Sequence, residues 1–521
     1  MKRIFFTLWA LGMALVLSAN PIDVEAARKI AEAFMDSLYR VKGGIEAAHS
    51  SDADLDMTLL YEVINDTLAE PKRAELYVFS PAELTGFVIV AGDDRVSPIV
   101  GYSTCSRFRT YNMPKHLEKY LSLYSQYIRQ VRKGTSEPIL QSEGEVLPVA
   151  PLIQTAWGQY HPYNMYCPKV DDKLTITGCT PTALAQIMKY HEWPERGHGT
   201  CTATLKNDTA TVSTTLGASY EWKNMINNYD YSNSYTASQA SAVAQLMKDV
   251  GYACNATYGA DITTARVHGV VTALLRHFDY SPTIRLVDRN YYSDRAWNDM
   301  ICHELHAGRP VLCSGVDNDS DVGHSFVCAG VDDSGRYYIN WGWGQQYSYN
   351  GYFDFNAIAP EEYDYCYQQK AIVHIKPIAE GEQEQDYMVL PHVGRIEITE
   401  QDNSLATPRV TYSIYVSNAT DKGIAGTIGY AVYKNGVMNS DGIKALNRYD
   451  ELKPGYYNKA ELWLNWSDAA EMSRGVREIH FYWCPKGETG WYIPFGEPII
   501  YMLTINEGHY FSTEKGMFDI D

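Results

Sequence analysis

Hydrophobic positions recur at helical spacing in two places within the first quarter of the chain. The first series begins directly after Asp23, which we expect to cap a helix, and the second ends before residue 130. Short runs of strand character separate them, so residues 20–145 are predicted to form an α+β domain. The helical positions are Val24, Ala27, Ala31, Phe34 and Leu38, then Leu117, Leu121, Tyr124 and Ile128; the strand runs are Leu76–Phe79, Gly86–Ala91 and Pro98–Tyr102.

A polar segment, Lys133–Glu145, follows the second helical series. It contains Gly134, Pro138 and Gly144, residue types that interrupt helices and strands. Exposed segments of this composition are where proteases cut most readily. We interpret it as a linker at which the chain is processed, so that the mature protein starts close to Val146–Pro151.

The pattern changes again after the acidic stretch Ala379–Asp386. Short strand-like runs follow one another, and Asn435 with Gly436 forms a strong hairpin signal between two of them. Regular short strands with turn signals predict a β-sandwich at 387–521. We find no catalytic cluster there and expect a packing or spacer module. The runs are Arg395–Thr399, Val410–Val416, Thr427–Tyr433, Ala460–Leu464, Glu478–Trp483 and Ile499–Thr504.

The extreme N-terminus has the pattern of a signal peptide. Lys2 and Arg3 precede the apolar run Ile4–Leu17, and Ser18 and Ala19 follow it. This order predicts a cleaved secretory signal at 1–19, because the run is short for a membrane span. We therefore expect a protein that is secreted, or exported to the periplasm or cell surface, with no membrane span after signal removal.

Charge and cysteine content exclude several function classes. The 521 residues, about three domains in length, carry a net charge of -19, which argues against nucleic acid as a partner. The ten cysteines include no pair with zinc-site spacing. We therefore expect no metal and no cofactor.

The middle segment, 146–378, contains the residues that suggest chemistry. Cys179 follows Gly178 and opens an apolar helical pattern that Pro194 ends, with Pro181 suited to the first turn. Unpaired N–H groups and the helix dipole at that position favour a thiolate. Gly178 is predicted to leave room for a substrate backbone. Cys179 is therefore the candidate nucleophile.

A general base for this thiol is predicted on a hairpin further along. Gly323 and His324 open one strand-like run, and Asn340 ends its return strand, which places Asn340 close to opposite His324. An Asn carbonyl there would fix the imidazole tautomer. Trp341 and Trp343 would shield that hydrogen bond from water.

An oxyanion hole is the third requirement of this chemistry. Gln159 lies upstream of the nucleophile, next to Trp157 and Gly158. Its amide and the backbone N–H of Cys179 are the predicted donors to the developing negative charge.

These segments resemble the streptopain family of secreted cysteine peptidases. Gly178-Cys179 with Ala185–His191 is similar to the family's nucleophile helix, and Gly323–Val327 with Asn340–Gly344 to its His and Asn-Trp segments. The stretches Trp157–Asn164, Gln245–Gly251 and Gly86–Asp94 resemble its oxyanion segment, a further motif and its inhibitory prodomain, in that order.

The resemblance implies a papain-like fold and a zymogen. It predicts a two-subdomain endopeptidase at 146–378 that acts on proteins or peptides, with residues 20–145 as its own inhibitory prodomain, and a role in virulence. The chain departs from the family at Thr180-Pro181 and at Gln345–Tyr349, and the second departure bears on the substrate cleft.

Two other functions remain open from the sequence alone. A transglutaminase-type acyltransferase uses the same Cys-His chemistry but transfers the acyl group to an amine. A non-catalytic surface protein that binds a partner would carry the same residues as a vestige. An assay with and without added amine separates the first from a peptidase, and labelling by a thiol-directed probe tests the second.

Overall fold

The computed structural model describes most of the chain between residues 21 and 513. The described ranges are 21–41, 55–64, 73–111, 113–135, 146–206, 210–229, 234–289, 294–316, 323–344, 349–354, 369–380, 392–402, 409–418, 423–434, 437–453, 457–465, 475–492, 501–506 and 509–513. The predicted signal peptide, most of the predicted linker, the acidic stretch from 381 and the Asn435-Gly436 turn lie outside them. Contacts divide the chain into unit 1, residues 1–144 with 353–360, and unit 2, residues 145–352 with 361–521.

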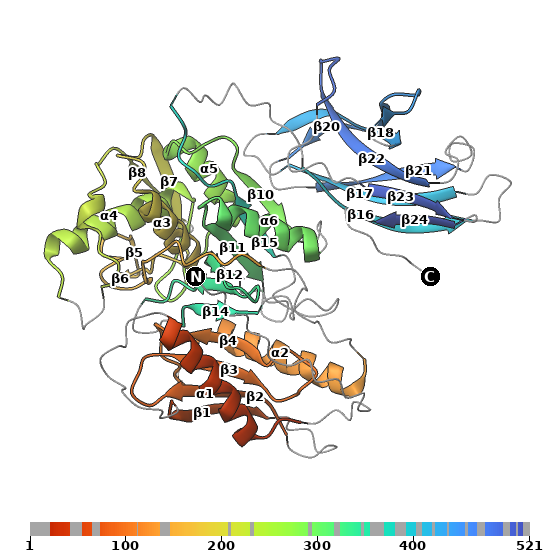
Figure 1. Ribbon diagram of the computed structural model, residues 1–521. Coiled ribbons are helices and arrows are strands. Elements are labelled where there is room, and N and C mark those ends of the chain that lie inside the picture. The colour runs from red at the N-terminus through yellow and green to blue at the C-terminus, as the bar shows by residue number, and fades with distance from the viewer. Residues whose placement is uncertain are drawn as a thin grey trace, which may run out of the picture. The chain divides into compact units, whose positions relative to one another are not determined.

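Unit 1 contains an antiparallel sheet and two long helices, as the alternation of patterns predicts (Figure 1). Asp23 caps the first helix, because its Oδ1 accepts from the Ala26 N–H at 2.8 Å. Strand β1 was not predicted from the sequence, because its apolar residues do not alternate with polar ones. The elements are α1 (Val24–Val41), β1 (Met57–Ile64), β2 (Ala74–Pro81), β3 (Phe87–Ala91), β4 (Ile99–Ser103) and α2 (Lys115–Lys133), and the strand order is β1-β2-β3-β4.

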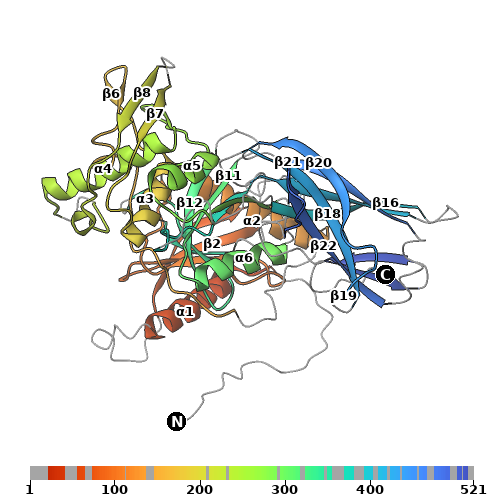
Figure 2. The same cartoon turned by 90° about the horizontal axis from the view of Figure 1, so that it is seen from above.

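The two helices of unit 1 lie on opposite sides of its sheet (Figure 2). Val88 pairs with both Phe79 and Tyr102, so these side chains share one face, and Phe34 of α1 packs on Tyr102 there. Ser125 of α2 donates to Glu75, and Arg28 of α1 lies over the Phe79 ring. Glu75 lies where the pairing of β2 with β1 shifts register, so it does not follow the alternation of Tyr77 and Phe79. One helix therefore covers each face of the sheet.

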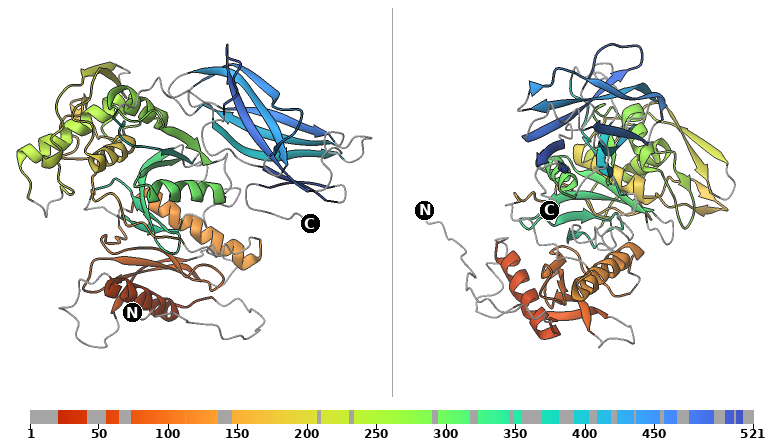
Figure 3. Two further views of the ribbon diagram at one scale, coloured as in Figure 1. Left: turned by 45° about the horizontal axis from the view of Figure 1, so that its top comes forward. Right: turned by 90° about the vertical axis from the view of Figure 1, so that its right-hand side faces the viewer.

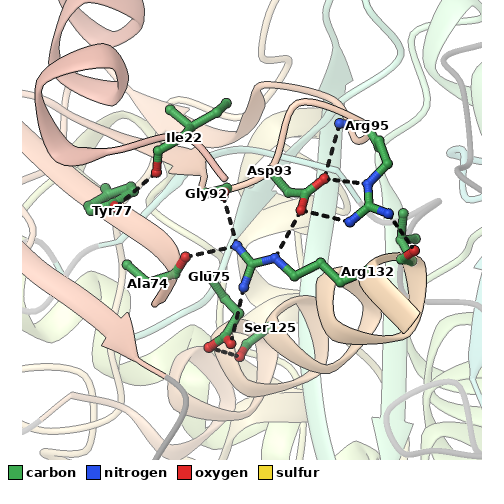
Figure 4. A network of polar contacts seen from close by, with 10 residues as sticks. Ile22, Ala74, Glu75, Tyr77, Gly92, Asp93, Arg95, Ser125 and Arg132 are labelled. Atoms are coloured by element: carbon green, nitrogen blue, oxygen red, sulfur yellow. Dashed lines mark hydrogen bonds and ion pairs between the residues drawn. The ribbon is translucent and has the colours of Figure 1, made fainter. Parts of the chain in front are cut away.

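A buried charge network joins α2 to the sheet (Figure 4). Arg132, near the end of α2, donates to the Asp93 carboxylate at 2.9 Å and to the backbone oxygens of Ala74 and Gly92. It also lies 3.5 Å from the Glu75 carboxylate. Asp93 and Glu75 are both fully buried, and a buried carboxylate requires such partners.

Asp93 is held in its charged form by two guanidinium groups. Arg95 adds a bidentate pair to it at 2.8 and 3.0 Å. Burial by itself raises the pKa of the Asp93 carboxyl, but hydrogen bonds from Arg95 and Arg132 outweigh this and hold the pKa below its ordinary value. Asp93 belongs to the stretch Gly86–Asp94, which resembles the family's inhibitory prodomain. The network gives Asp93 a structural role within that stretch.

Unit 2 begins with a helical part that holds the predicted nucleophile helix. Its core packs buried residues of three helices together, among them Leu184, Leu246 and Leu274. Figure 2 shows these helices beside a small sheet in the order β8-β7-β9. The elements are β5 (Lys169–Val170), β6 (Lys173–Leu174), α3 (Cys179–His191), β7 (Thr200–Leu205), β8 (Thr211–Thr215), the 3-10 turn η1 (Trp222–Asn224), α4 (Ala237–Ala253), β9 (Thr257–Tyr258) and α5 (Val267–His277).

A larger antiparallel sheet forms the next part of unit 2. Its strands within unit 2 follow the order β14-β13-β12-β11-β15-β10. Helix α3 contacts Ser325 of β12, and α6 contacts Tyr337 of β13; Figure 2 shows the two helices on opposite sides of these strands. The elements are β10 (Arg285–Asp288), α6 (Asp294–His306), β11 (Val311–Val316), β12 (Gly323–Val331), β13 (Tyr337–Asn340), β14 (Gly351–Phe353, with Phe353 assigned to unit 1) and β15 (Lys370–Val373).

The C-terminal region consists of antiparallel strands, seen from two further sides in Figure 3. One sheet has the order β16-β17-β21 and the other β19-β18-β22-β23-β24, with β20 also on β18. Ile479, Phe481 and Trp483 alternate along β22 and are buried, as expected of a strand with one inner face. The strands are β16 (His392–Asp402), β17 (Arg409–Ser417), β18 (Ile424–Lys434), β19 (Val437–Met438), β20 (Lys444–Leu452), β21 (Tyr457–Asn465), β22 (Gly475–Pro485), β23 (Tyr501–Asn506) and β24 (His509–Thr513).

Within the described ranges, no helix has both the length and the apolar character that crossing a membrane requires.

Candidate active site

Cys179 is the first residue of α3, and Gly178 is its N-cap with φ 87° and ψ 151°. The Thr182 N–H and hydroxyl both donate to the Gly178 carbonyl, which begins the helix. A Cβ at Gly178 would lie 3.0 Å from the backbone oxygen of Thr263. The space that a side chain at Gly178 would take is filled by Thr263, and glycine is required by the positive φ and the close approach. Room for a substrate backbone at Gly178 stays a prediction.

Strand β12 meets the beginning of α3 at the thiol. The Ser325 backbone N–H donates to Cys179 Sγ. The hydroxyls of Thr180 and Ser325 lie 2.8 Å apart. The residues that follow Cys179 and His324 are thus bonded to each other, which brings the start of α3 and the start of β12 together.

The resting state of Cys179 differs from the predicted thiolate. Burial raises the pKa of the Cys179 thiol above its ordinary value, and hydrogen bonds from Ser325 and Thr180 offset this only in part. The contribution expected from the helix N-terminus is present, since the N–H groups of Cys179 and Thr180 lower the pKa, but removal from water outweighs it. In the full-length chain these contacts favour the neutral thiol.

His324 is buried and its ring is fixed on one edge by the backbone. Its Nε2 lies 3.0 Å from the carbonyl oxygen of Trp341. A carbonyl can only accept, so this nitrogen carries the proton and Nδ1 is the nitrogen able to act as a base. The His324 ring stacks on Trp341 at 6.2 Å and on Trp343 at 5.3 Å between centroids, and the two indoles are within 4° of parallel.

Asn340 does not occupy the predicted place opposite His324. The hairpin register pairs Asn340 with Val327, after an irregularity between Cys328 and Gly330. Asn340 therefore lies three residues along the strand from the position facing His324. Its amide is buried and donates to the Thr155 carbonyl and to Gln186. The acceptor for His324 is the backbone carbonyl of Trp341, the residue after Asn340. The prediction that the Asn340 side chain accepts this hydrogen bond is therefore wrong.

Gln159 lies on the segment that runs past the start of α3. Its backbone carbonyl accepts from Thr177 N–H at 3.2 Å. The segment is also joined to the residues after β13, because Gly344 N–H donates to Trp157 O at 3.0 Å and a Cβ on Gly158 would lie 3.0 Å from Gly344 N. The backbone beside Gln159 is thus bonded both to the approach to Cys179 and to the Trp343-Gly344 turn.

Other predicted positions are placed as follows. Gly323 is exposed and is the first residue of β12. Of the departure segment Gln345–Tyr349, the described part is Tyr349, which is buried and packs edge-on against Trp343. Within the described ranges no group of three or more His, Cys, Asp or Glu residues has the geometry to hold a metal ion.

Sequence reasoning missed Gln186. It lies within the Ala185–His191 motif, to which no role beyond resemblance was assigned, yet its side chain is fully buried and bonds to Thr155, Trp157 and Asn340. The available signal was a Gln among apolar residues on the core face of a helix, a place where polar side chains require internal partners.

A cysteine at a helix N-terminus, bonded to the strand that carries a backbone-anchored histidine, defines a papain-like cysteine peptidase. Comparison with known proteins gives the same class. Residues 157–353 match the Peptidase C10 family and residues 19–128 match the Spi protease inhibitor family. The chain belongs to the peptidase C10 family: it is a cysteine peptidase preceded by a Spi-type inhibitor domain, the arrangement of a zymogen.

Individual relatives agree with this assignment. The thiol protease/hemagglutinin PrtT of Porphyromonas gingivalis is 30% identical over 72% of this chain, which spans 44% of PrtT's length. Streptopain of Streptococcus pyogenes is 31% identical over 69% of this chain and 95% of its own. A fragment of Prevotella intermedia prointerpain A is 29% identical, with a TM-score of 0.52 over 62% of this chain and all of that fragment. The comparisons give no support to the acyltransferase or to the non-catalytic alternative.

Proposed function

We propose that this chain is a secreted endopeptidase in which Cys179 is the nucleophile and His324 the general base. The observation that carries the proposal is the meeting of the two segments: Cys179 Sγ accepts from the N–H of the residue next to His324, and His324 is oriented by the Trp341 carbonyl.

The chemistry follows from the tautomer. His324 Nδ1 takes the proton of the Cys179 thiol as sulfur attacks the peptide carbonyl, and the imidazolium then protonates the leaving amine. The backbone N–H of Cys179 and the amide of Gln159 hold the negative oxygen of the tetrahedral intermediate. Water, activated by His324, hydrolyses the acyl-enzyme.

The stacked rings of Trp341 and Trp343 have a role in this proposal. Two apolar surfaces against the imidazole keep water from the hydrogen bond between His324 and the Trp341 carbonyl, which preserves the required tautomer. Support comes from the small ring separations and the near-parallel indoles.

Substitution of single residues tests the assignment. Cys179→Ala and His324→Ala should each remove nearly all peptide hydrolysis after processing, and Gln159→Ala should lower kcat about 10²–10³-fold. Asn340→Ala should be milder, because it touches neither the thiol nor the imidazole. Hydrolysis of a peptide library, read by mass spectrometry with folding checked by circular dichroism, supplies the measurement. Wild-type hydrolysis by Cys179→Ala would refute the assignment.

The same assay separates hydrolysis from acyl transfer. With peptide and water alone the products should be two shorter peptides, and an added primary amine should not replace water in the product. A product carrying the amine in preference to the free acid would favour a transglutaminase-type reaction.

Export and self-inhibition complete the proposal. The match to the inhibitor family begins at residue 19, directly where the predicted signal peptide ends, which supports removal of 1–19 and secretion or export. We propose that residues 20–145 act as the chain's own inhibitor and that proteins or peptides are its substrates, with no role for nucleic acid. The virulence role and the β-sandwich spacer stay predictions.

A further inference from the structure

Gln186 occupies a central place beneath the proposed site. It lies seven residues after Cys179, two helical turns along the same face of α3, and its exposed fraction is 0%. Its Oε1 accepts from the Thr155 hydroxyl at 2.9 Å, the Trp157 N–H at 3.2 Å and the Asn340 amide at 3.0 Å. Its Nε2 donates to Asn340 Oδ1 at 3.2 Å. Three chain segments therefore meet at one side chain.

The first consequence concerns the histidine. Asn340 Oδ1 accepts from Gly342 N–H at 3.1 Å, so it closes the turn that presents the Trp341 carbonyl to His324. The paired amides of Gln186 and Asn340 hold this turn against α3. Gly342 has φ +74°, and a Cβ there would lie 4.0 Å from Gln186 Nε2, so the turn packs directly on the helix.

The second consequence concerns the oxyanion segment. Trp157 N–H is bonded to Gln186, and Trp157 O accepts from Gly344 N–H. Trp157 is fully buried and stands two residues before Gln159. The same glutamine thus fixes the backbone that leads to the proposed oxyanion donor.

We infer that Gln186 is a positioning residue that couples the nucleophile helix to both the base and the oxyanion donor of the reaction. The inference rests on the proposed function of Cys179, His324 and Gln159. Gln186 touches none of the reacting atoms; it sets their mutual placement, on which the rate depends steeply, since a displacement of about 1 Å can cost about 10²-fold.

The first test removes the amide and keeps the volume. Gln186→Met in the full-length chain, processed by a trace of wild-type enzyme, should lower kcat about 10²-fold with little change in KM. Cys179→Ala with the same trace gives the background. Gln245→Met is the matched control. The Gln245 side-chain amide donates to the buried Asp249 carboxylate at 3.0 Å, but it lies on α4 and bonds to none of these described segments. The kcat of this variant should stay near that of the wild type.

The second test keeps the acceptor and removes the donor. Gln186→Glu retains an oxygen for Thr155 and Trp157 but sets a carboxylate against Asn340 Oδ1. A buried carboxyl takes up a proton readily, and the protonated form can donate again. The ratio of variant to wild-type kcat should therefore rise about tenfold or more as pH falls from 8 to 5, a response that simple destabilisation would not give.

The outcomes separate this inference from the proposed function. If Gln186→Met keeps wild-type kcat while Cys179→Ala is inactive, the positioning role is refuted and the nucleophile assignment stands. If Gln186→Met does not fold, the pH response of Gln186→Glu decides, and a flat ratio of the two kcat values overturns the inference. Activity in Cys179→Ala would overturn the proposed function itself.

Discussion

The imidazole of His324 is oriented by a main-chain atom, the carbonyl oxygen of Trp341. A side-chain substitution cannot delete this acceptor; it can only move it. The position of the acceptor depends on the turn from Asn340 to Gly342, where the positive φ of Gly342 favours glycine. The orientation of the imidazole therefore depends on the backbone conformation of this turn. Two side chains hold the turn: Asn340 Oδ1 accepts from Gly342 N–H, and Asn350 Oδ1 accepts from Trp341 N–H at 3.0 Å.

The protonation state of Cys179 gives a prediction at this scale. Burial raises the pKa of its thiol, so in the uncut chain thiolate should form only at a pH above the ordinary thiol range. The rate of alkylation of Cys179 by iodoacetamide should keep rising where a cysteine in a short peptide has already reached its plateau. Mass spectrometry of the Cys179 peptide, sampled over time from pH 5 to 10, measures this rate.

The His324→Ala chain is the control for that titration. If burial governs the thiol, its alkylation profile should remain shifted to high pH. A plateau in the wild type below the ordinary thiol range, abolished in His324→Ala, would instead show a thiolate stabilised by the imidazolium, and would contradict a raised pKa for the Cys179 thiol.

Single residues were predictable from sequence to different degrees. Cys179 and His324 carry strong local signals, a helix start and a strand start, and the residues that follow them are bonded to each other. Asn340 was placed wrongly because an irregularity between Cys328 and Gly330 sets the hairpin register, and a hydrophobic pattern does not reveal such an irregularity. Gln186 gained its role only through contacts with segments 29 to 154 residues away.

At the scale of elements, α2 is attached to its sheet by charge as well as by apolar packing. Arg132 lies between two fully buried carboxylates, Asp93 and Glu75. Removal of one partner from a buried pair typically costs about 3–5 kcal/mol, because the remaining charge is left without compensation. The Asp93–Arg132 contact is therefore a point at which unit 1 can be weakened selectively.

We predict that Arg132→Met loosens β2 and β3. Backbone amides of these strands should exchange hydrogen at least about a hundredfold faster at pH 7, which corresponds to about 3 kcal/mol. Hydrogen exchange of the full-length Cys179→Ala chain, read by mass spectrometry, localises the effect. Arg40→Met is the control, since the Arg40–Asp36 pair is largely exposed and should be worth less than about 1 kcal/mol. Equal exchange in both variants would argue against the network.

The Asp93 network also predicts how the stability of β2 and β3 changes with pH. The pKa of Asp93 is lower in the folded state than its ordinary value, so its contribution to stability is present above the ordinary pKa and is lost as pH falls through the folded-state pKa. Protection of β2 and β3 in the wild type should therefore approach that of Asp93→Asn only in strong acid.

Helices and strands could be predicted from the sequence where burial of one face makes the hydrophobic positions repeat with a helical or a strand period. Helices α1 and α2 have one apolar face, and β22 alternates inward and outward residues, so each was predictable. Strands β1 and β20 are mostly half-exposed or exposed, which leaves no period-two signal. These two segments form strands because they pair with β2 and β18. Such pairing is a tertiary effect, which the β-propensity of single residues does not predict.

At the scale of the whole molecule, backbone pairing limits where the chain can be cut. Val149 exchanges two hydrogen bonds with Val331, at 2.8 and 3.0 Å, and Leu152 N–H donates to Ala329 O. A Cβ on Gly330 would lie 2.7 Å from Val149 O, so this segment lies tightly along β12, the strand that begins with Gly323 and His324. Proteases require an extended, unpaired substrate, and residues from Val149 onward do not offer one.

Processing should therefore fall before Val149, either at the upstream end of the predicted window or within the linker that precedes it. The Cys179→Ala chain should stay full length when pure and be trimmed by a trace of active enzyme, with the new N-terminus at residues 146–148 or earlier in 133–145. N-terminal sequencing locates the cut, and the same trace pretreated with a thiol alkylator is the control. A cut beyond Val149 would remove pairing that supports β12 and should yield an unstable product. Full activity of the uncut wild-type chain, or failure of separately produced residues 20–145 to inhibit the processed enzyme, would contradict the zymogen mechanism, because an inhibitor domain that neither blocks the site nor needs removal has no regulatory effect.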